Sequence, residues 1–228
     1  MKVAAIVPSA GAGRRFGQRR NKLFKVVAGA PILAHTLRAL QASPTIRWII
    51  LPTRSADASQ VQALLKRYRI TKALPVVRGG RSRAESVARA FAHVPAGADW
   101  VLVHDGARPC LTRATLHRTL NAAQRQGAVA CGLPASLTVK AVKRDGRVEQ
   151  TLDRRRLWFV QTPQVFRREW FAQALSRANG TLSSHPDDAS LVEAAGFPVR
   201  MVLGDPLNLK VTTREDLLLA ETILRKCG

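Results

Sequence analysis

The chain has 228 residues, of which 46% are hydrophobic, a composition typical of a folded globular protein and not of a disordered one. Its 37 Lys and Arg residues outnumber 15 Asp and Glu residues and give a formal net charge of +22, so nucleic-acid binding has to be considered. The basic residues are nevertheless spread through the whole chain and aromatic residues reach only 5%, which argues against a nucleic-acid partner. No apolar run approaches the roughly 20 residues of a membrane-spanning helix. The N-terminal apolar stretch is too short for a signal peptide, so we expect a cytoplasmic protein with no membrane partner.

Strand-like and helix-like patterns alternate along the first 133 residues. Apolar runs predict strands at 3–8, 48–51, 74–77, 100–104 and 128–133, and apolar residues at helical spacing predict helices at 32–40, 61–68, 84–94 and 114–126. Continuous apolar strands separated by amphipathic helices indicate an α/β fold with a doubly wound, mainly parallel sheet. Ligands of such folds lie beyond the carboxyl ends of the strands.

The pattern then changes to an alternation around Asp145-Gly146, the strongest hairpin signal in the sequence. A hairpin inserted late in an α/β chain is expected to project as an arm, and a second subunit is the natural surface for it to pack on. We therefore predict one domain over residues 1–228, a dimerisation arm at about 135–157 and a homodimer. Beyond the arm we expect strands at 158–166 and 199–202 and helices at 169–177, from Asp187, and at 214–225.

The first predicted strand leads into a glycine-rich segment, Pro8–Gly17. Glycines after a strand let the backbone approach a phosphate closely, although a plain tight turn has the same composition. A dinucleotide-binding loop is the functional competitor, with Arg54 as a ligand of a 2′-phosphate. The GxGxxxG spacing and the polar run 18–22 argue against it, because that loop should open into an amphipathic helix. A loop that carries Arg15 and Lys22 is better suited to a triphosphate.

Eight motifs in this order resemble the 2-C-methyl-D-erythritol 4-phosphate cytidylyltransferase family: Pro8–Phe16 with Lys22, Gly79–Val87, His104–Pro109, Thr138–Lys140, Asp153–Trp158, Gln161–Phe166, Asp187–Ser190 and Asn208–Thr212. The resemblance implies a Rossmann-like nucleotidyltransferase fold with a projecting β-hairpin arm. It also implies that CTP and 2-C-methyl-D-erythritol 4-phosphate give 4-diphosphocytidyl-2-C-methyl-D-erythritol and pyrophosphate, in the non-mevalonate isoprenoid pathway. Two alternatives stay open, a ribitol-5-phosphate cytidylyltransferase and a non-catalytic basic nucleic-acid-binding protein.

The resemblance also assigns roles to residues. It implies catalytic roles for Arg15, Lys22 and Asp105, with Asp105 binding Mg²⁺ or another divalent cation. Implied contacts to the nucleotide come from Ser9, Ala10, Gly11, Ala12, Gly13, Gly80, Ser86, Gly106 and Arg108. Implied contacts to the sugar-alcohol phosphate come from Thr138, Arg154, Thr162 and Lys210, of which Thr138 and Arg154 would serve the neighbouring subunit. His104 is expected to support Asp105.

The sequence departs from the family pattern at two positions of interest. Pro186 stands where the family usually has Thr, and proline has neither a hydroxyl nor an N–H, so one hydrogen bond to the substrate phosphate must be missing or replaced. Ser183, Ser184 and His185 are nearby candidates to replace it. Asn21 stands where the family usually has Pro, and we expect it to loosen the loop slightly.

Overall fold

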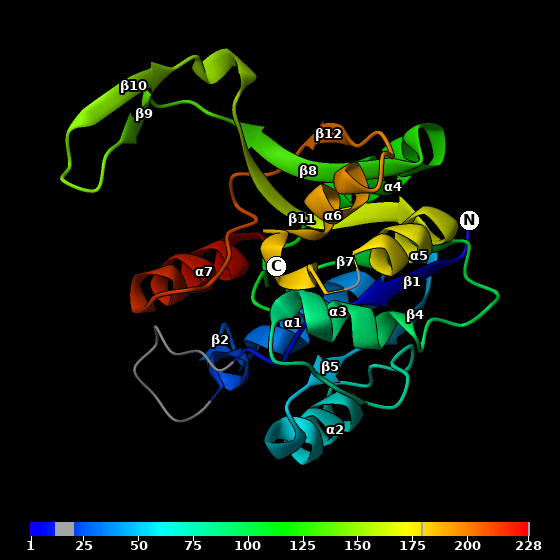
Figure 1. Ribbon diagram of the computed structural model, residues 1–228. Helices are drawn as coiled ribbons and strands as arrows, with labels where there is room; N and C mark the ends of the chain where they lie inside the picture. The colour runs from blue at the N-terminus through cyan, green and yellow to red at the C-terminus, as the bar shows by residue number, and fades with distance from the viewer. Residues whose placement is uncertain (12–20, 179, 228) are drawn as a thin grey trace.

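A six-stranded sheet forms the centre of the protein, as seen in a computed structural model that describes residues 1–11, 21–178 and 180–227 (Figure 1). Its strand order is β12 (Arg200–Leu203), β8 (Ala128–Pro134), β11 (Trp158–Arg167), β7 (Trp100–Val103), β1 (Val3–Ile6) and β4 (Ile46–Ile50). Only β11 runs antiparallel to its neighbours, and the other pairs in this sheet are parallel. The prediction of a doubly wound, mainly parallel sheet is therefore confirmed.

Helices cover both faces of this sheet (Figure 1). They are α1 (Ile32–Gln41), α2 (Ala58–Arg67), α3 (Arg83–Phe91), α4 (Arg113–Gln126), α5 (Arg168–Arg177), α6 (Asp188–Ala194) and α7 (Arg214–Cys227). Side chains alternate along β1, so that Val3 and Ala5 pack in one apolar cluster with α1, α2 and α4, whereas Ala4 and Ile6 pack in a second with α3, α5 and α6. Across the described ranges, no helix is both long and apolar enough to cross a membrane.

The strand predicted at 74–77 is wrong in its position. The N–H of Leu74 donates to the carbonyl of Ile49, but Pro75 has no N–H and interrupts the ladder at this point. The chain pairs again only at β6 (Val77–Arg78), which forms a separate two-stranded parallel sheet with β5 (Pro52–Thr53). This small sheet extends the central one beyond the end of β4 and leads directly into Gly79.

Several short elements complete the body of the fold. They are the antiparallel pair β2 (Val26–Val27) and β3 (Ala30–Pro31) and the 3₁₀ helices η2 (Lys22–Phe24), η3 (Ser55–Asp57), η4 (Arg154–Arg156) and η5 (Leu182–Ser184). Two of them, η2 and η3, follow the glycine-rich segment and β5, respectively, and both lie next to the candidate site described below.

The predicted hairpin is present and projects from the body as an arm (Figure 1). Its strands are β9 (Val139–Val142) and β10 (Val148–Leu152), and both lie within the range of about 135–157 predicted for the arm. Gly146 has a φ of 85°, a value that favours glycine, and this explains why the Asp-Gly pair marks the turn. Large apolar side chains on or beside the arm are exposed, among them Leu137 (74%) and Phe159 (56%).

Phe171 belongs to the second apolar cluster and provides a test of this core. It is fully buried, stacks on Phe166 at 5.2 Å between ring centroids and meets Phe91 edge to face at 5.4 Å. We expect Phe171→Ala to lower the free energy of unfolding by about 3–5 kcal/mol, because it opens a cavity that rigid neighbours cannot fill. Urea unfolding measures the change, and Gln62→Ala on the exposed face of α2 serves as the control. A loss below about 1 kcal/mol would contradict this packing.

Candidate active site

Two parallel strands, β1 and β7, end side by side at one edge of the sheet, and the segments that follow them line a cavity of about 530 Å³ together with the start of α3 and Lys210. Its lining includes Ala10, Gly11, Lys22, Gly80, Ser86 and Gly106, together with Asp105 and Lys210. These residues come from segments that are far apart in the sequence. The cavity lies where the topology of an α/β sheet predicts a ligand.

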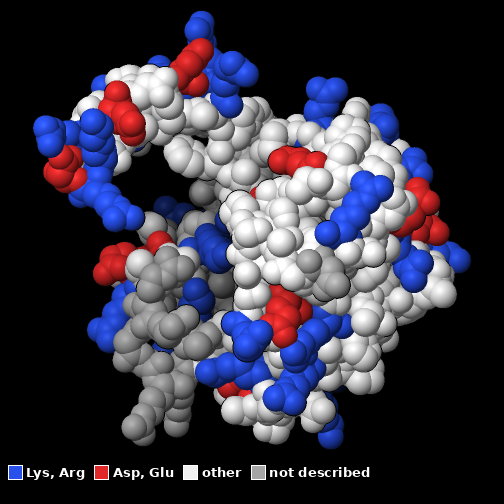
Figure 2. All heavy atoms as spheres, viewed as in Figure 1, with Lys and Arg blue, Asp and Glu red and all other residues white. Residues whose placement is uncertain are grey.

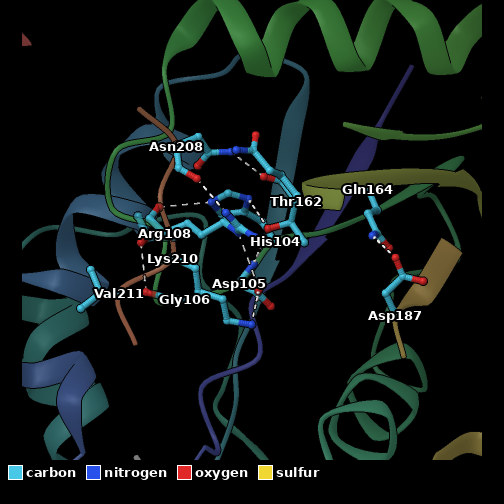
Figure 3. A network of polar contacts seen from close by, with 12 residues as sticks. His104, Asp105, Gly106, Arg108, Thr162, Gln164, Asp187, Asn208, Lys210 and Val211 are labelled. Carbon is cyan, nitrogen blue, oxygen red and sulfur yellow. Dashed lines mark hydrogen bonds and ion pairs between the residues drawn. The ribbon is translucent and has the colours of Figure 1, made fainter. Parts of the chain in front are cut away.

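Asp105 is a buried carboxylate with cations around it at this edge of the sheet (Figure 3). Its carboxylate is 3.0 Å from Nε of Arg83 and 2.8 Å from Nζ of Lys210, and Nε of Arg108 lies 3.7 Å away. Burial on its own raises the pKa of a carboxyl group. The surrounding cations, Arg83 and Lys210 above all, outweigh burial and hold the pKa of Asp105 far below its usual range. The protein therefore keeps a buried, fully ionised carboxylate next to the cavity.

A second cavity, of about 470 Å³, lies on the other side of Asp105. Thr162, Gln164, Pro186 and Asp187 are among its lining residues, and it shares Arg83, Asp105 and Lys210 with the first cavity. Two separate binding spaces thus meet at one carboxylate and two cations, an arrangement suited to bringing two anionic substrates together.

Arg83 bridges Asp105 to a second buried carboxylate, Asp188, which lies 2.8 Å from NH1 of Arg83. Burial raises the pKa of Asp188, and Arg83 only partly compensates. Arg83 itself is the first residue of α3, whose N-cap, Ser82, accepts a hydrogen bond from the N–H of Glu85. A capped helix start therefore fixes the side chain that joins the two cavities.

Thr162 comes to the site through an irregularity in β11. Val160 pairs with Gly132 and Gln164 pairs with Ala130, so the three residues between them stand opposite the single Cys131. This bulge places the hydroxyl of Thr162 within 3.0 Å of the N–H of Asp105, from which it accepts a hydrogen bond.

The hydrogen bonds around His104 determine its tautomer. Nε2 lies 3.3 Å from the carbonyl of Arg108, which can only accept, so Nε2 carries the proton. In the neutral ring Nδ1 is then an acceptor, and the hydroxyl of Thr162, 3.0 Å away, donates to it while accepting from the N–H of Asp105. Burial lowers the pKa of His104 to about 4. Neutral His104 thus fixes Thr162 and the backbone of Asp105 from behind.

The glycine-rich side of the first cavity is less completely described. Arg15, Ala12 and Gly13 lie outside the described residues. Lys22 lines the cavity, and its Nζ donates to the carbonyl of Val211 at 2.6 Å. Ser9 lines neither of the two cavities, since its hydroxyl donates to the carbonyl of Val7.

The opposite wall includes Gly80 and Ser86, and Gly79 lies directly before it in the chain. The hydroxyl of Ser86 donates to the carbonyl of Ser82 and accepts from the N–H of Gly80 at 2.9 Å, so it fixes the shape of the Gly80 backbone. A Cβ on Gly79 would come within 2.5 Å of the Cβ of Ala10, so glycine is required where the two walls approach each other.

Three further predicted site residues take other positions. Arg108 lines the second cavity but not the first, and it donates to the carbonyl of Asn208 at 2.7 Å. Thr138 and Arg154 are exposed, line neither cavity, and belong to the arm and its base, where Arg154 donates to the carbonyl of Ser136. Their predicted substrate contacts are not formed within one chain.

Comparison with known proteins places this site in a family. The family model described as 2-C-methyl-D-erythritol 4-phosphate cytidylyltransferase matches residues 3–226. The chain belongs to this family. A cytidylyltransferase of that name from Syntrophus aciditrophicus is 42% identical over 99% of this chain and 97% of the relative, and one from Bacillus mycoides is 40% identical over 96% of each.

Solved structures of the same family share the fold. A 4-diphosphocytidyl-2C-methyl-D-erythritol synthase from Anaerococcus prevotii has a TM-score of 0.85 at 27% identity and covers 98% of both chains. The 2-C-methyl-D-erythritol 4-phosphate cytidylyltransferase from Thermus thermophilus has a TM-score of 0.79 at 32% identity and covers 99% of this chain and 100% of the other.

The structure adds site residues to which the sequence assigned no role. Arg83 and Asp188 form the bridge between the cavities, although they are far apart in the sequence and only the family motifs point to them. Asn208 donates from its side-chain amide to the carbonyl of Thr162 at 2.8 Å and fixes the bulge. Asn21, which we expected to loosen the loop, is itself buried and makes three hydrogen bonds, whereas the loop that precedes it, residues 12–20, lies outside the described residues.

His104 predicts a pH dependence of stability. Its pKa falls from 6.5 to about 4 on folding, so the unfolded chain binds more protons between these values and stability decreases as the pH falls through this window. The loss amounts to roughly 3 kcal/mol. We expect urea unfolding between pH 7 and 4 to show a smaller decrease for His104→Gln than for the wild type, with the exposed His93→Gln as control. Parallel curves for His104→Gln and the wild type would contradict the assignment.

Proposed function

We propose that this chain is a 2-C-methyl-D-erythritol 4-phosphate cytidylyltransferase. In the proposed reaction, an oxygen of the acceptor's phosphate attacks the α-phosphorus of CTP. The new P–O bond forms as the bond to the β-phosphate breaks, and pyrophosphate leaves with the electron pair. The observation that carries the proposal is the meeting of two cavities at Asp105, Arg83 and Lys210 in a chain of this family.

The chemistry of the two linings supports one substrate in each cavity. The first cavity offers backbone groups near Gly80 to a cytosine ring, whose edge needs both donors and acceptors. Lys22 lies on the same cavity and would balance the charge of the triphosphate, as would Arg15. The second cavity is left for the acceptor, with Lys210 and Thr162 toward its phosphate. Catalysis then consists of positioning and of positive charge where negative charge develops.

The acceptor's phosphate has few hydroxyl partners in the second cavity. Pro186 lines it without a donor, and the hydroxyl of Ser190 is engaged in the capping box of α6 with Asp187. Cations are therefore the main ligands that this chain can offer, Lys210 and Arg83 among them. We propose that they, and Arg154 of a second subunit, replace the hydrogen bond that Pro186 cannot make.

The described residues of the site could hold a divalent cation through a single carboxylate. Across the residues that the structure describes, no three His, Cys, Asp or Glu side chains gather into a metal site. Asp105 is an ionised oxygen ligand beside the nucleotide cavity, and Mg²⁺ is commonly held by one carboxylate together with substrate phosphates. When bound, Mg²⁺ would neutralise charge on the triphosphate. Asp105 would exchange its contact with Lys210 for the ion.

A homodimer completes the proposal. Apolar side chains on and near the arm, including Leu137, Val142 and Phe159, are exposed in the single chain and would be covered by a partner. The arm would also carry Thr138 and Arg154 to the partner's acceptor cavity. Lys and Arg are spread over the visible face and the arm and do not follow one track (Figure 2), so a nucleic-acid partner is not proposed. A cytoplasmic location stays a prediction.

Release of pyrophosphate tests the proposed function. We expect release from CTP and Mg²⁺ with 2-C-methyl-D-erythritol 4-phosphate, and at least about tenfold less with ribitol 5-phosphate or with UTP in place of CTP. Preference for ribitol 5-phosphate would support the other cytidylyltransferase. Absence of release with either acceptor, together with tight, salt-sensitive binding of DNA or RNA, would favour the non-catalytic alternative.

Mixed dimers test the shared site. Lys22→Ala and Arg154→Ala are each expected to lower turnover strongly, because each removes a cation from the charge balance of the transition state. Co-expressed subunits should recover about a quarter of the wild-type rate, since about half of the dimers are hybrids and each hybrid has one intact composite site. Isolated hybrid dimers with no more activity than the parent variants would show that Arg154 serves its own chain.

A further inference from the structure

Asn21 is a buried junction beside the catalytic lysine. Its side chain is 3% exposed and lies directly before Lys22, as the N-cap of η2. Its amide nitrogen donates to the carbonyl of Ser9 at 3.2 Å and to Oδ2 of Asp57 at 2.9 Å. Its amide oxygen accepts from the N–H of Leu23 at 3.1 Å. Both amide protons and the oxygen are thus used, which no side chain without an amide can reproduce.

Asp57, the partner of Asn21, is itself held in place. Arg54 donates to both of its oxygens, at 2.7 and 2.9 Å, in a bidentate pair. Burial raises the pKa of Asp57, but the hydrogen bonds from Arg54 and Asn21 keep the pKa below its usual value. In the dinucleotide-binding alternative, Arg54 was the candidate ligand of a 2′-phosphate. In the structure its guanidinium binds Asp57 instead.

The short strand β5 connects the junction around Asn21 to the opposite wall of the nucleotide cavity. The carbonyl of Pro52 accepts from the N–H of Ser9 at 2.9 Å, and the carbonyl of Thr53 accepts from the N–H of Gly79 at 2.8 Å. Arg54 and η3 follow β5 directly. Asn21 therefore ties the segment that carries Lys22 to the backbone frame that carries Gly79 and Gly80.

We propose that Asn21, held by Asp57 and Arg54, is a positioning residue that fixes Lys22 relative to the Gly80 wall of the nucleotide cavity. The proposal rests on the proposed function, because it concerns the placement of Lys22 toward the triphosphate. Asn21 also lines the nucleotide cavity, but its amide is occupied by Ser9, Asp57 and Leu23, so its proposed effect on turnover is exerted through Lys22. A cation on a short 3₁₀ helix needs such a fixed point, because a displacement of about 1 Å at the reacting centre can cost on the order of 100-fold in rate.

Two variants separate the link to Asp57 from the helix cap. Asn21→Ser keeps an oxygen that can accept from the N–H of Leu23 but loses the donor to Asp57, whereas Asn21→Ala loses both. We expect both to lower kcat about 10- to 100-fold. The KM for 2-C-methyl-D-erythritol 4-phosphate should stay within about twofold, because the second cavity is unchanged. Unchanged kcat in Asn21→Ser would overturn the proposal, whatever the kcat of Asn21→Ala.

A double-variant cycle tests whether Asn21 acts through Lys22. In a Lys22→Ala background, Asn21→Ser should change turnover by no more than about twofold, since there is no lysine left to misplace. If the two losses multiply instead, Asn21 acts independently of Lys22 and the proposal fails.

An exchange of the two side chains tests the link to Asp57. Asn21→Asp places a second carboxylate against Asp57 and should have a kcat as low as that of Asn21→Ser or lower. The double variant Asn21→Asp with Asp57→Asn should regain several-fold in kcat, because one amide again faces one carboxylate. Absence of this rescue would count against the link.

Gln41→Ala is the matched control for loss of a bridging amide. Gln41 also joins separate segments, donating to the carbonyl of Arg69 at 2.8 Å and accepting from the N–H of Lys72, but it lines neither cavity. Gln41→Ala should lower the thermal midpoint of unfolding without changing kcat.

All assays are run below each variant's thermal transition. A wild-type protein that releases no pyrophosphate would reject the proposed function, whereas an active wild type with an equally active Asn21→Ser would reject only the role of Asn21.

Discussion

The structure of the site depends on one interaction, the balance between the buried carboxylate of Asp105 and the cations around it. An unpaired ionised carboxylate in this position would cost several kcal/mol, so the surrounding charges are a requirement of the fold. Two of these cations also make a second contact: Arg83 reaches Asp188, and Arg108 donates to the carbonyl of Asn208. One carboxylate therefore fixes the start of α3, the loop after β7 and the segment before α7 relative to one another.

This balance also explains why a strongly basic site is stable before substrates bind. Arg83 and Lys210 are already paired with Asp105 and Asp188, so these carboxylates offset the repulsion among the cations in the ligand-free protein. In the proposed function, incoming phosphates would replace these carboxylates as partners of the cations. The pairing also keeps the cations in place, which lowers the reorganisation needed at the moment of reaction.

The parts of the site that the sequence predicted share one property, which is that their placement follows from local or topological rules. Asp105 follows a buried strand, and strands of a parallel sheet end at the same edge. The arm was predictable because an Asp-Gly turn is a local signal. The strand at 74–77 was misplaced because apolar periodicity ignores the missing N–H of Pro75.

Contacts between distant residues could not be predicted in this way. Asn21 and Asp57 are 36 positions apart, and neither carries a local signal for the other. The same is true of Arg83 and Asp188, which only the folded sheet brings within 2.8 Å. The family pattern made Asn21 look like a loosened loop position, because it stands where a proline is usual. Its burial is a property of the tertiary structure.

The antiparallel strand β11 joins two regions that would otherwise be independent. Its first residues, Trp158–Val160, are exposed at the base of the arm, and its later residues, Gln161–Phe166, are buried in the core, with Thr162 at the site between them. No flexible linker separates the two halves. The base of the projecting hairpin and Thr162 therefore belong to one continuous strand. A displacement of the arm would be transmitted along the backbone that positions the Thr162 hydroxyl next to Asp105.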